Sequence, residues 1–309
     1  MNMGCPVPGG LFFWQQFAVN KLNNMKIAVV GMGLIGGSMA IDLKRKGFAQ
    51  EVIGVENDRV HAEAALKLGL ADRIEPFENA VSEADITILA VPVSAAEKLL
   101  PKALDIYAAE GSGCQRIVID VCSVKEPMLR SVHYHPMRQR YVATHPMSGT
   151  EYRGPWAALP GLFDGRAGII CNSEDSDRRA VKTVEKLYDT LNMRTVYMNG
   201  SNHDVHTAYI SHASHVISFA LANTVLEKEK DEKHIFDLAS GGFSSTVRLA
   251  KSGADMWVPI FMDNSDNLLN VIDSYMDNLK AFRDAIADCD ADKTRELIES
   301  ANRIKRIIR

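Results

Sequence analysis

The sequence of 309 residues predicts an α/β protein whose N-terminal part is a doubly wound parallel sheet and whose C-terminal part is entirely helical. Short apolar strands alternate with amphipathic helices from residue 26 to about residue 198, which is typical of a parallel sheet covered on both faces. A glycine-rich turn joins the first strand to the first helix, and strand patterns cease after residue 199. We therefore expect domains over residues 25–198 and 199–309.

Composition and charge exclude several classes of protein. The chain has 35 basic and 39 acidic residues and a net charge of −4, so no sequence-wide basic field favours nucleic acid. The five cysteines are scattered and include no CxxC pair, which argues against a disulfide framework or a thiolate zinc site and fits a reducing cytoplasm. The charge-free stretch 27–41 is broken by glycines and is shorter than the ~18 residues of a membrane span. Residues 1–24 resemble a signal peptide poorly, so we expect them to be an upstream extension.

The glycine turn after the first strand carries a dinucleotide fingerprint. The strand KIAVV is followed by GMGLIGGS, in which Gly31, Gly33 and Gly36 satisfy G-x-G-x-x-G. In this fingerprint the first glycine allows the tight turn, the second lets the backbone approach a pyrophosphate, and the third lets helix and strand pack closely. Helix N-termini bind anions, so Leu34 and Ile35 join the candidate cofactor site of a Rossmann-type domain.

A second strand, EVIGVE, supports this interpretation. It ends in Glu56, 25 residues after Gly31, near the position of the acid that hydrogen-bonds the ribose hydroxyls of a dinucleotide. An acid there repels a 2′-phosphate, so we expect NAD rather than NADP, although Arg59 lies close in sequence. The alternative is a flexible glycine turn followed by an ordinary strand-end acid.

Later strands end in polar or glycine-rich segments where ligands of such sheets bind. One group of candidates follows the strands ITILAVP and IVIDV, and the loop YVATHPMSGTE supplies another. Turn and cap chemistry explains Ser123 equally well, and an exposed loop imidazole is the simpler account of His145. The candidates are Val91, Pro92, Ser94, Cys122, Ser123, Lys125, His145, Ser148, Thr150 and Glu151.

The helical part begins with SNHD, which we interpret as a capping box with Ser201 as N-cap and Asp204 three residues later. Its four histidines project at about 0°, 300°, 180° and 120° on a regular helix, so no metal site is expected. Ser211 and His215 lie on one face as i and i+4 partners. They are candidates for a cleft, although His215 is equally well explained as a core residue.

Two features follow farther along the chain. GGFSSTVRLAKSG places Arg248 six residues after a glycine pair, where a guanidinium can hold a carboxylate or simply lie on an exposed helix. The last helical run has an apolar stripe that core or subunit-interface packing explains. The stripe consists of Ile260, Leu268, Leu269, Ile272, Met276, Leu279, Phe282 and Ile286.

The order of these motifs resembles the prephenate and arogenate dehydrogenase family of tyrosine biosynthesis. The resemblance rests on GMGLIGGS, DVCSVK, HPMSGTE, HDVHTAYISHASH and GGFSSTVRLAKSGADMW, and it covers residues 25 to about 257. It implies an NAD-dependent oxidative decarboxylation of prephenate to 4-hydroxyphenylpyruvate. It also implies a homodimer formed through the C-terminal helical domain.

The resemblance further implies a role for each matching residue. His145 is expected to deprotonate the ring hydroxyl, and Ser123 to bind that hydroxyl and orient His145. Arg248 is expected to hold the side-chain carboxylate of the substrate. The residues expected to complete or shape the substrate pocket are His215, Ser211, Thr150, His203 and Glu151.

Three alternatives stay open on the sequence alone. The first is arogenate dehydrogenase. Its substrate, arogenate, has an amino group where prephenate has a keto group, and Arg248 serves both substrates. A reductase or β-hydroxyacid dehydrogenase shares the two-domain plan but gives no reason for HPMSGTE and SHxxH together. A non-catalytic dimer that senses NAD is the third.

Overall fold

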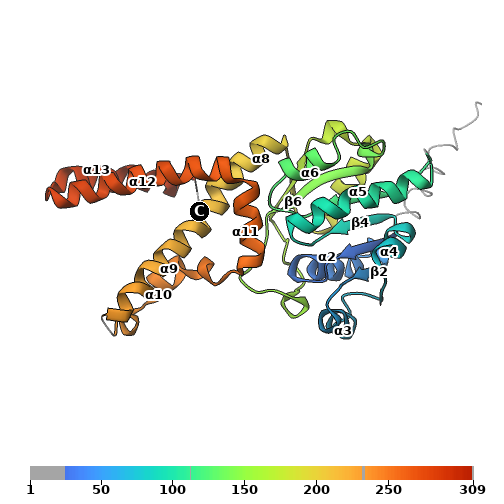
Figure 1. The fold of residues 1–309 in the computed structure, drawn as a ribbon, viewed down its shortest axis with the longest axis horizontal. Helices are drawn as coiled ribbons and strands as arrows, with labels where there is room; N and C mark the ends of the chain where they lie inside the picture. Colours follow the sequence, from blue (N-terminus) through green and yellow to red (C-terminus); the bar gives the residue numbers. More distant parts are fainter. Residues whose placement is uncertain (1–24, 112, 232–233, 308–309) are drawn as a thin grey trace, which may run out of the picture.

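The computed structural model describes residues 25–111, 113–231 and 234–307, and it arranges them as a sheet domain followed by a helical domain (Figure 1). The expected extension over residues 1–24 lies outside the described residues. The last strand, β8, ends at Met198 and the next helix, α8, begins at Gly200. The division that we expect at residues 198 and 199 therefore falls between these two elements.

Eight strands form one sheet in the order β3-β2-β1-β4-β5-β6-β7-β8. All neighbouring pairs from β3 to β6 are parallel, so the predicted doubly wound α/β class is confirmed. The order steps outward from β1 in both directions, which makes the carboxyl ends of β1 and β4 the switch point where ligands bind. The strands are β1 (Met25–Val30), β2 (Ala49–Val55), β3 (Arg73–Ile74), β4 (Ile86–Leu89), β5 (Ile117–Asp120), β6 (Tyr141–Pro146), β7 (Ala167–Cys171) and β8 (Arg194–Met198).

Helices cover both faces of this sheet, and alternate strand residues enter two separate cores. In β1, Ile27 and Val29 belong to the core under α2, α3 and α7, whereas Ala28 and Val30 belong to the core under α4, α5 and α6. This alternation follows from the two-residue period of a strand. The helices are α2 (Leu34–Arg45), α3 (Arg59–Lys67), α4 (Phe77–Glu83), α5 (Val93–Ala109), α6 (Glu126–Ser131) and α7 (Arg178–Thr190).

The last two strands depart from the fully parallel sheet that the sequence predicts. β7 runs antiparallel to β6, and β8 runs parallel to β7. Parallel neighbours need a crossover connection, but residues 147–166 form only a short 3-10 turn (Pro155–Ala157) and re-enter the sheet at the same end. Two hydrogen bonds tie this connection to α2: Leu159 N–H donates to Ser38 Oγ at 3.0 Å, and Gly161 N–H donates to Asp42 Oδ2 at 2.9 Å.

The helical domain begins with one nearly continuous rod made of α8 (Gly200–Thr207), a π-helical turn (Ala208–His212) and α9 (Ala213–Asp231). Its N-cap is Asn199, whose side chain accepts from Asn202 N–H at 2.7 Å. The predicted capping box is therefore wrong, because Ser201 already lies inside the helix. The later elements are 3-10 turns (Phe236–Leu238, Arg248–Lys251 and Asn302–Arg306), α10 (Gly241–Thr246), α11 (Ala254–Asp263), α12 (Ser265–Ala287) and α13 (Ala291–Ala301).

The helical domain extends away from the sheet as two diverging arms, α9 with α10 and α12 with α13, while α11 lies between the arms and the sheet (Figure 1). Much of the apolar stripe predicted for the last helices is uncovered. Leu269, Met276, Leu279 and Ile286 are each more than half exposed. Leu268 on the same helix is buried against the rod, so α12 packs through one side only.

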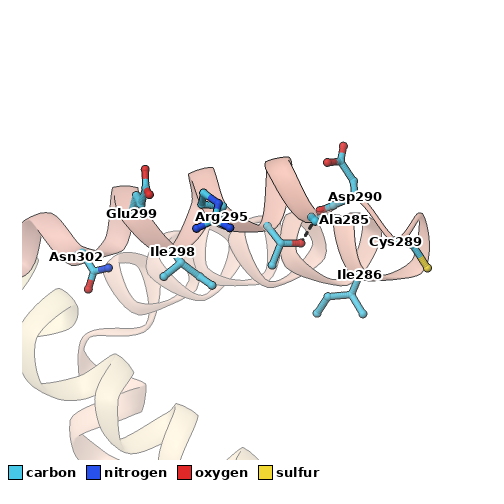
Figure 2. A pocket seen from close by; sticks show the side chains of 10 residues that line it. Ala285, Ile286, Cys289, Asp290, Arg295, Ile298, Glu299 and Asn302 are labelled. Atoms are coloured by element: carbon cyan, nitrogen blue, oxygen red, sulfur yellow. Dashed lines mark hydrogen bonds between the residues drawn. The ribbon is translucent and has the colours of Figure 1, made fainter.

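A surface groove of about 600 Å³ lies between α12 and α13, at the end of the arm farthest from the sheet (Figures 1 and 2). Ile286, Cys289 and Ile298 are among the residues that line it. No helix within the described ranges is both long and apolar enough to span a lipid bilayer.

Candidate functional site

The glycine turn forms a bare backbone cradle at the carboxyl end of β1. Gly31 has φ +95°, a conformation that favours glycine. A Cβ on Gly36 would lie 2.1 Å from the Gly31 carbonyl oxygen, so only glycine lets α2 start this close to the strand. Gly33, the N-cap of α2, has no atom within 4 Å of the place where a Cβ would be, apart from its chain neighbours. The space at Gly33 is therefore open, and Leu34 and Ile35 follow it in the first turn of α2.

Glu56 directly follows β2 and reaches toward this cradle. Its Oε2 accepts from Met32 N–H at 3.2 Å, inside the glycine turn, and its Oε1 accepts from Asp58 N–H at 3.1 Å. Arg59 pairs with Glu63 on the exposed surface of α3, with 3.1 Å between Nε and Oε1. A carboxylate thus lies where a dinucleotide fold places its ribose-binding acid.

The other wall of the cradle is the end of β4. A Cβ at Gly31 would lie 2.4 Å from the Ala90 carbonyl oxygen and 2.9 Å from Val91 Cγ1, so this wall touches the glycine turn. Pro92 is the N-cap of α5, and Ser94 is exposed in its first turn. The candidate cofactor residues from three separate segments therefore lie together at the switch point.

His145 lies at the carboxyl end of β6 and is only 8% exposed. Its Nδ1 is 2.8 Å from Nε2 of His203, and Nδ1 of His203 is 2.7 Å from Oδ1 of Asp204. Burial lowers the pKa of His145 well below its ordinary value, and His203 and Lys125 lower it further. His145 is therefore a neutral imidazole near pH 7 whose Nε2 is not engaged by His203.

A buried ion pair lies beside the end of β6, which carries His145. The Lys125 ammonium contacts the Asp120 carboxylate and donates to the carbonyl of Thr144, the preceding residue, at 2.7 Å. Burial alone lowers the pKa of Lys125, but the Asp120 carboxylate raises it above its ordinary value, so Lys125 is an ammonium ion near pH 7. Asp120 also accepts from the Tyr141 hydroxyl at 2.7 Å. These contacts fix the ends of β5 and β6 relative to each other.

Ser123 is half-buried in the short loop between β5 and α6. The loop is held from below, because Cys122 N–H donates to Asp120 Oδ2 at 3.0 Å and Val124 and Lys125 are fully buried. Burial raises the pKa of the Cys122 thiol above its ordinary value, so that thiol is protonated and not a nucleophile. Ser123 is the polar residue of this loop, residues 121–125, that is not buried.

His215 is presented by α9 and covered by an aromatic side chain. Its ring stacks on Trp257 of α11, with ring centroids 3.5 Å apart and an interplanar angle of 27°. Its Nδ1–H donates to the Ser211 carbonyl at 3.0 Å, so the predicted i, i+4 pair exists through the backbone and leaves Nε2 free. Burial lowers the pKa of His215, and Arg248 lowers it further.

Arg248 joins the helical domain to the loop that follows β6. Its Nη1 is 3.3 Å from Oε2 of Glu151, and the Arg248 side chain is 51% exposed. A hydrogen bond with its own backbone N–H and the nearby guanidinium together lower the pKa of Glu151. Thr150 lies next to this pair and accepts from Tyr152 N–H at 3.2 Å. Ser148, in contrast, donates to the Leu162 carbonyl at 2.7 Å and serves the loop itself.

Sequence reasoning missed Asp204 and Trp257, both of which lie within this arrangement. Asp204 is 1% exposed, and His203 beside it is fully buried. The signal was the spacing of polar residues on α8, where His203, Asp204 and Thr207 share the buried face at i, i+1 and i+4. Trp257 lies at the end of the segment GGFSSTVRLAKSGADMW, and no sequence pattern distinguishes it from an ordinary core residue.

The histidines of the rod do not follow the uniform helical spacing that we assumed. The π turn over Ala208–His212 changes their phase. His203 contacts His145, whereas His212 and His215 both lie against Trp257. In the part of the chain that the structure describes, no group of three histidine, cysteine or acidic side chains has the arrangement of a metal site.

Comparison with known proteins places this arrangement in a family. Residues 39–197 match the model of the prephenate dehydrogenase nucleotide-binding domain, and residues 199–300 match that of the prephenate dehydrogenase dimerization domain. The chain belongs to the prephenate dehydrogenase family. It is 31% identical to the prephenate dehydrogenase of Bacillus subtilis over 275 residues, which cover 88% of this chain and 73% of that protein.

Solved structures of the prephenate dehydrogenase family are similar over most of the chain. The prephenate dehydrogenase of Aquifex aeolicus, in complex with hydroxyphenyl propionate and NAD+, is 26% identical with a TM-score of 0.80, covering 92% of this chain and 97% of that chain. The arogenate dehydrogenase of Synechocystis is 25% identical with a TM-score of 0.70, covering 91% and 99%. The protein is thus an oxidoreductase of this family, and both substrate types occur among its relatives.

Proposed function

We propose that the protein catalyses the NAD-dependent oxidative decarboxylation of prephenate to 4-hydroxyphenylpyruvate. The observation that carries this proposal is His145, a buried neutral imidazole at the same edge of the sheet as the glycine cradle. Ser123 lies in the loop that follows the neighbouring strand β5, and Arg248 supplies a half-exposed cation beside the loop that follows β6. Arogenate is the second candidate substrate, because Arg248 can hold the side-chain carboxylate of either molecule and an arogenate dehydrogenase is among the similar structures.

The residues of the cradle fit NAD. The open space at Gly33 and the free amides at the start of α2 suit a pyrophosphate. Glu56 suits the ribose hydroxyls, and its charge disfavours a 2′-phosphate. When bound there, NAD supplies the hydride acceptor for the reaction.

Exchange of a single glycine tests this cofactor site. Gly33→Ala is expected to raise the Kd for NAD at least about 10-fold, because its Cβ would occupy the space into which the pyrophosphate must fit. The melting temperature should change by no more than about 3 °C, since the Cβ meets no protein atom. Gly36→Ala is the matched control, because its Cβ meets the Gly31 carbonyl and lowers stability instead. Unchanged NAD affinity in folded Gly33→Ala would place the cofactor elsewhere.

The chain's own part in the chemistry is to move one proton and hold the substrate. As hydride leaves the ring carbon that bears the hydroxyl, the hydroxyl proton passes to His145 Nε2 and the C–O bond becomes a carbonyl. The ring carboxylate then departs as carbon dioxide, and its bonding electrons make the ring aromatic. The phenolate oxygen takes the proton back, so His145 ends neutral and no net proton is released. Ser123 and Arg248 align the substrate for these steps.

The pH dependence of the reaction follows from the burial of His145. Only the neutral form accepts the proton, and burial lowers the pKa of this group, so the active form persists to lower pH than an ordinary histidine allows. We expect kcat/KM to stay constant from pH 8 down through about 6.5 and to fall only below that value. Rates measured between pH 5 and 8 check this expectation. An acid limb with its midpoint above 6.5 would contradict it.

A two-by-two assay tests the proposed function directly. Prephenate or arogenate is offered with NAD or NADP, and reduced nicotinamide is followed by absorbance. Prephenate with NAD should give the highest kcat/KM. A higher value with arogenate would make the second candidate correct. Tight NAD binding without turnover of either substrate would instead favour a non-catalytic sensor.

We further propose that the partner of the helical domain is a second copy of the chain. The exposed apolar side chains of α12 and the match to a dimerization domain support this. Light scattering should give about twice 34.1 kDa. A monomer at micromolar concentration would contradict it.

A further inference from the structure

The buried Asp204 carboxylate lies within hydrogen-bond distance of three partners. Its Oδ1 is 2.7 Å from Nδ1 of His203 and accepts from Lys125 N–H at 2.8 Å, and its Oδ2 accepts from Glu126 N–H at 2.8 Å. An ionised carboxylate has acceptors only. Each of its three partners must therefore donate, and the proton of His203 is located on Nδ1.

The location of this proton determines the next one. Burial lowers the pKa of His203, so the ring is neutral and its Nε2 has a lone pair. Because Nε2 lies 2.8 Å from Nδ1 of His145, that nitrogen must carry the proton of the His145 ring. Nε2 of His145 is then left with a lone pair. This state is the one that can take a proton from a substrate hydroxyl.

We propose that Asp204 is a positioning residue that fixes the tautomers of His203 and His145 and thereby presents the basic nitrogen of His145 to the substrate. The inference rests on the proposed function, because it assigns His145 the proton transfer. Asp204 does not touch the reacting atoms and acts through His203. In a Ser-His-Asp triad the aspartate orients its histidine in a comparable way, there by direct contact.

The same carboxylate also fixes the loop that carries Ser123. Lys125 and Glu126, whose backbone amides it accepts from, lie two and three residues after Ser123. The Asp204 side chain therefore positions both His145 and Ser123, the two residues that are proposed to contact the substrate hydroxyl. The Asp204 carbonyl in turn accepts from Asn264 Nδ2 at 2.7 Å, which anchors Asp204 to the start of α12.

Asp204→Asn tests the role of the charge with little change in size. The amide has one acceptor oxygen in place of two and adds an N–H₂ donor, so it cannot satisfy all three partners. We expect kcat to fall at least about 10-fold, because part of the His145 population takes the wrong tautomer. KM for the accepted substrate and Kd for NAD should change less than about threefold. A kcat within twofold of the unmodified enzyme would overturn the proposal.

Asp42→Asn is the matched control for loss of a buried carboxylate. Asp42 is 3% exposed and accepts from Gly161 N–H at 2.9 Å, a bond that an amide oxygen can keep. We expect its kcat to stay within about twofold of the unmodified value. An equal loss of kcat in both variants would indicate a general structural effect and count against the assigned role.

A measurement on the unmodified chain separates this inference from the proposed function. The ¹⁵N shifts of ¹⁵N-histidine-labelled protein at pH 7.5 report each tautomer, with resonances assigned through His145→Gln and His203→Gln. Both rings should be protonated at Nδ1, and Asp204→Asn should shift this population. An Nε2–H form of His145 in the unmodified protein would overturn the inference even if the enzyme turns over prephenate. Failure of both substrates in the assay would refute the function and leave the tautomers measurable.

Discussion

Replacing His145 with asparagine is expected to lower kcat at least about 100-fold, because a general base contributes on the order of 10² to 10⁴ in rate. The Kd for NAD should stay within about twofold, since the cradle is built from β1, α2 and the end of β4 rather than from β6. Steady-state rates and calorimetric titration with NAD measure the two effects separately. The combination of lost turnover and retained binding is the signature of a residue used in the chemical step.

The control for this substitution is His133→Asn, which removes an exposed histidine of the same domain. Its kcat should stay within about twofold of the unmodified enzyme. Because His145 is buried against His203, the melting temperature of His145→Asn is measured as well. A folded His145→Asn variant that kept more than a tenth of the unmodified kcat would remove His145 from its assigned role.

The parts of the fold that the sequence predicts well are set by short-range rules. A glycine is required at Gly31 by its positive φ and at Gly36 by contact with a carbonyl only five residues away. The strand and helix periods are likewise local, and they place the cradle correctly. The direction of β7 could not be predicted in this way, because it depends on how residues 147–166 lie along α2 through Ser38 and Asp42.

The sequence indicates which residue types form the candidate site, but it does not indicate which of these residues contact one another. His145 and His203 are 58 positions apart, and Asp204 reaches amides 78 and 79 positions away. The sequence around His203 does not show whether its side chain packs against His145 or faces the substrate. We expected His203 to shape the substrate pocket, but it is fully buried between His145 and Asp204, so we propose that it supports His145 instead.

The π turn explains a second difference between sequence and structure. At 100° per residue His212 and His215 diverge from His203, whereas a turn of i→i+5 hydrogen bonds alters the phase of every residue after it. No residue type in AYISH requires such a turn. It becomes favourable only with contacts from other elements, such as Trp257 of α11, which packs against both later histidines.

Replacing Arg248 with alanine is expected to raise KM for the accepted substrate about 10- to 100-fold while kcat falls less than about threefold. A hydrogen bond between charged groups contributes about 1.5–3 kcal/mol, and the carboxylate that Arg248 is proposed to hold is remote from the reacting ring carbon. The ion pair between Arg248 and Glu151 does not prevent Arg248 from binding the substrate carboxylate. An ion pair in which the arginine is half exposed is screened by solvent and contributes little to stability, so a substrate carboxylate can replace Glu151 at small cost.

Two further variants decide whether Arg248 binds the substrate carboxylate by two hydrogen bonds or only by its positive charge. Arg248→Lys keeps the charge but loses the bidentate geometry, so its KM should lie between those of the unmodified enzyme and Arg248→Ala. Lys251→Ala removes an exposed cation from the same 3-10 turn, and its KM should stay within about twofold. Equal increases for Arg248→Ala and Lys251→Ala would mean that the turn attracts the substrate by its overall charge. A fall in kcat with unchanged KM would instead place Arg248 in the chemical step rather than in binding.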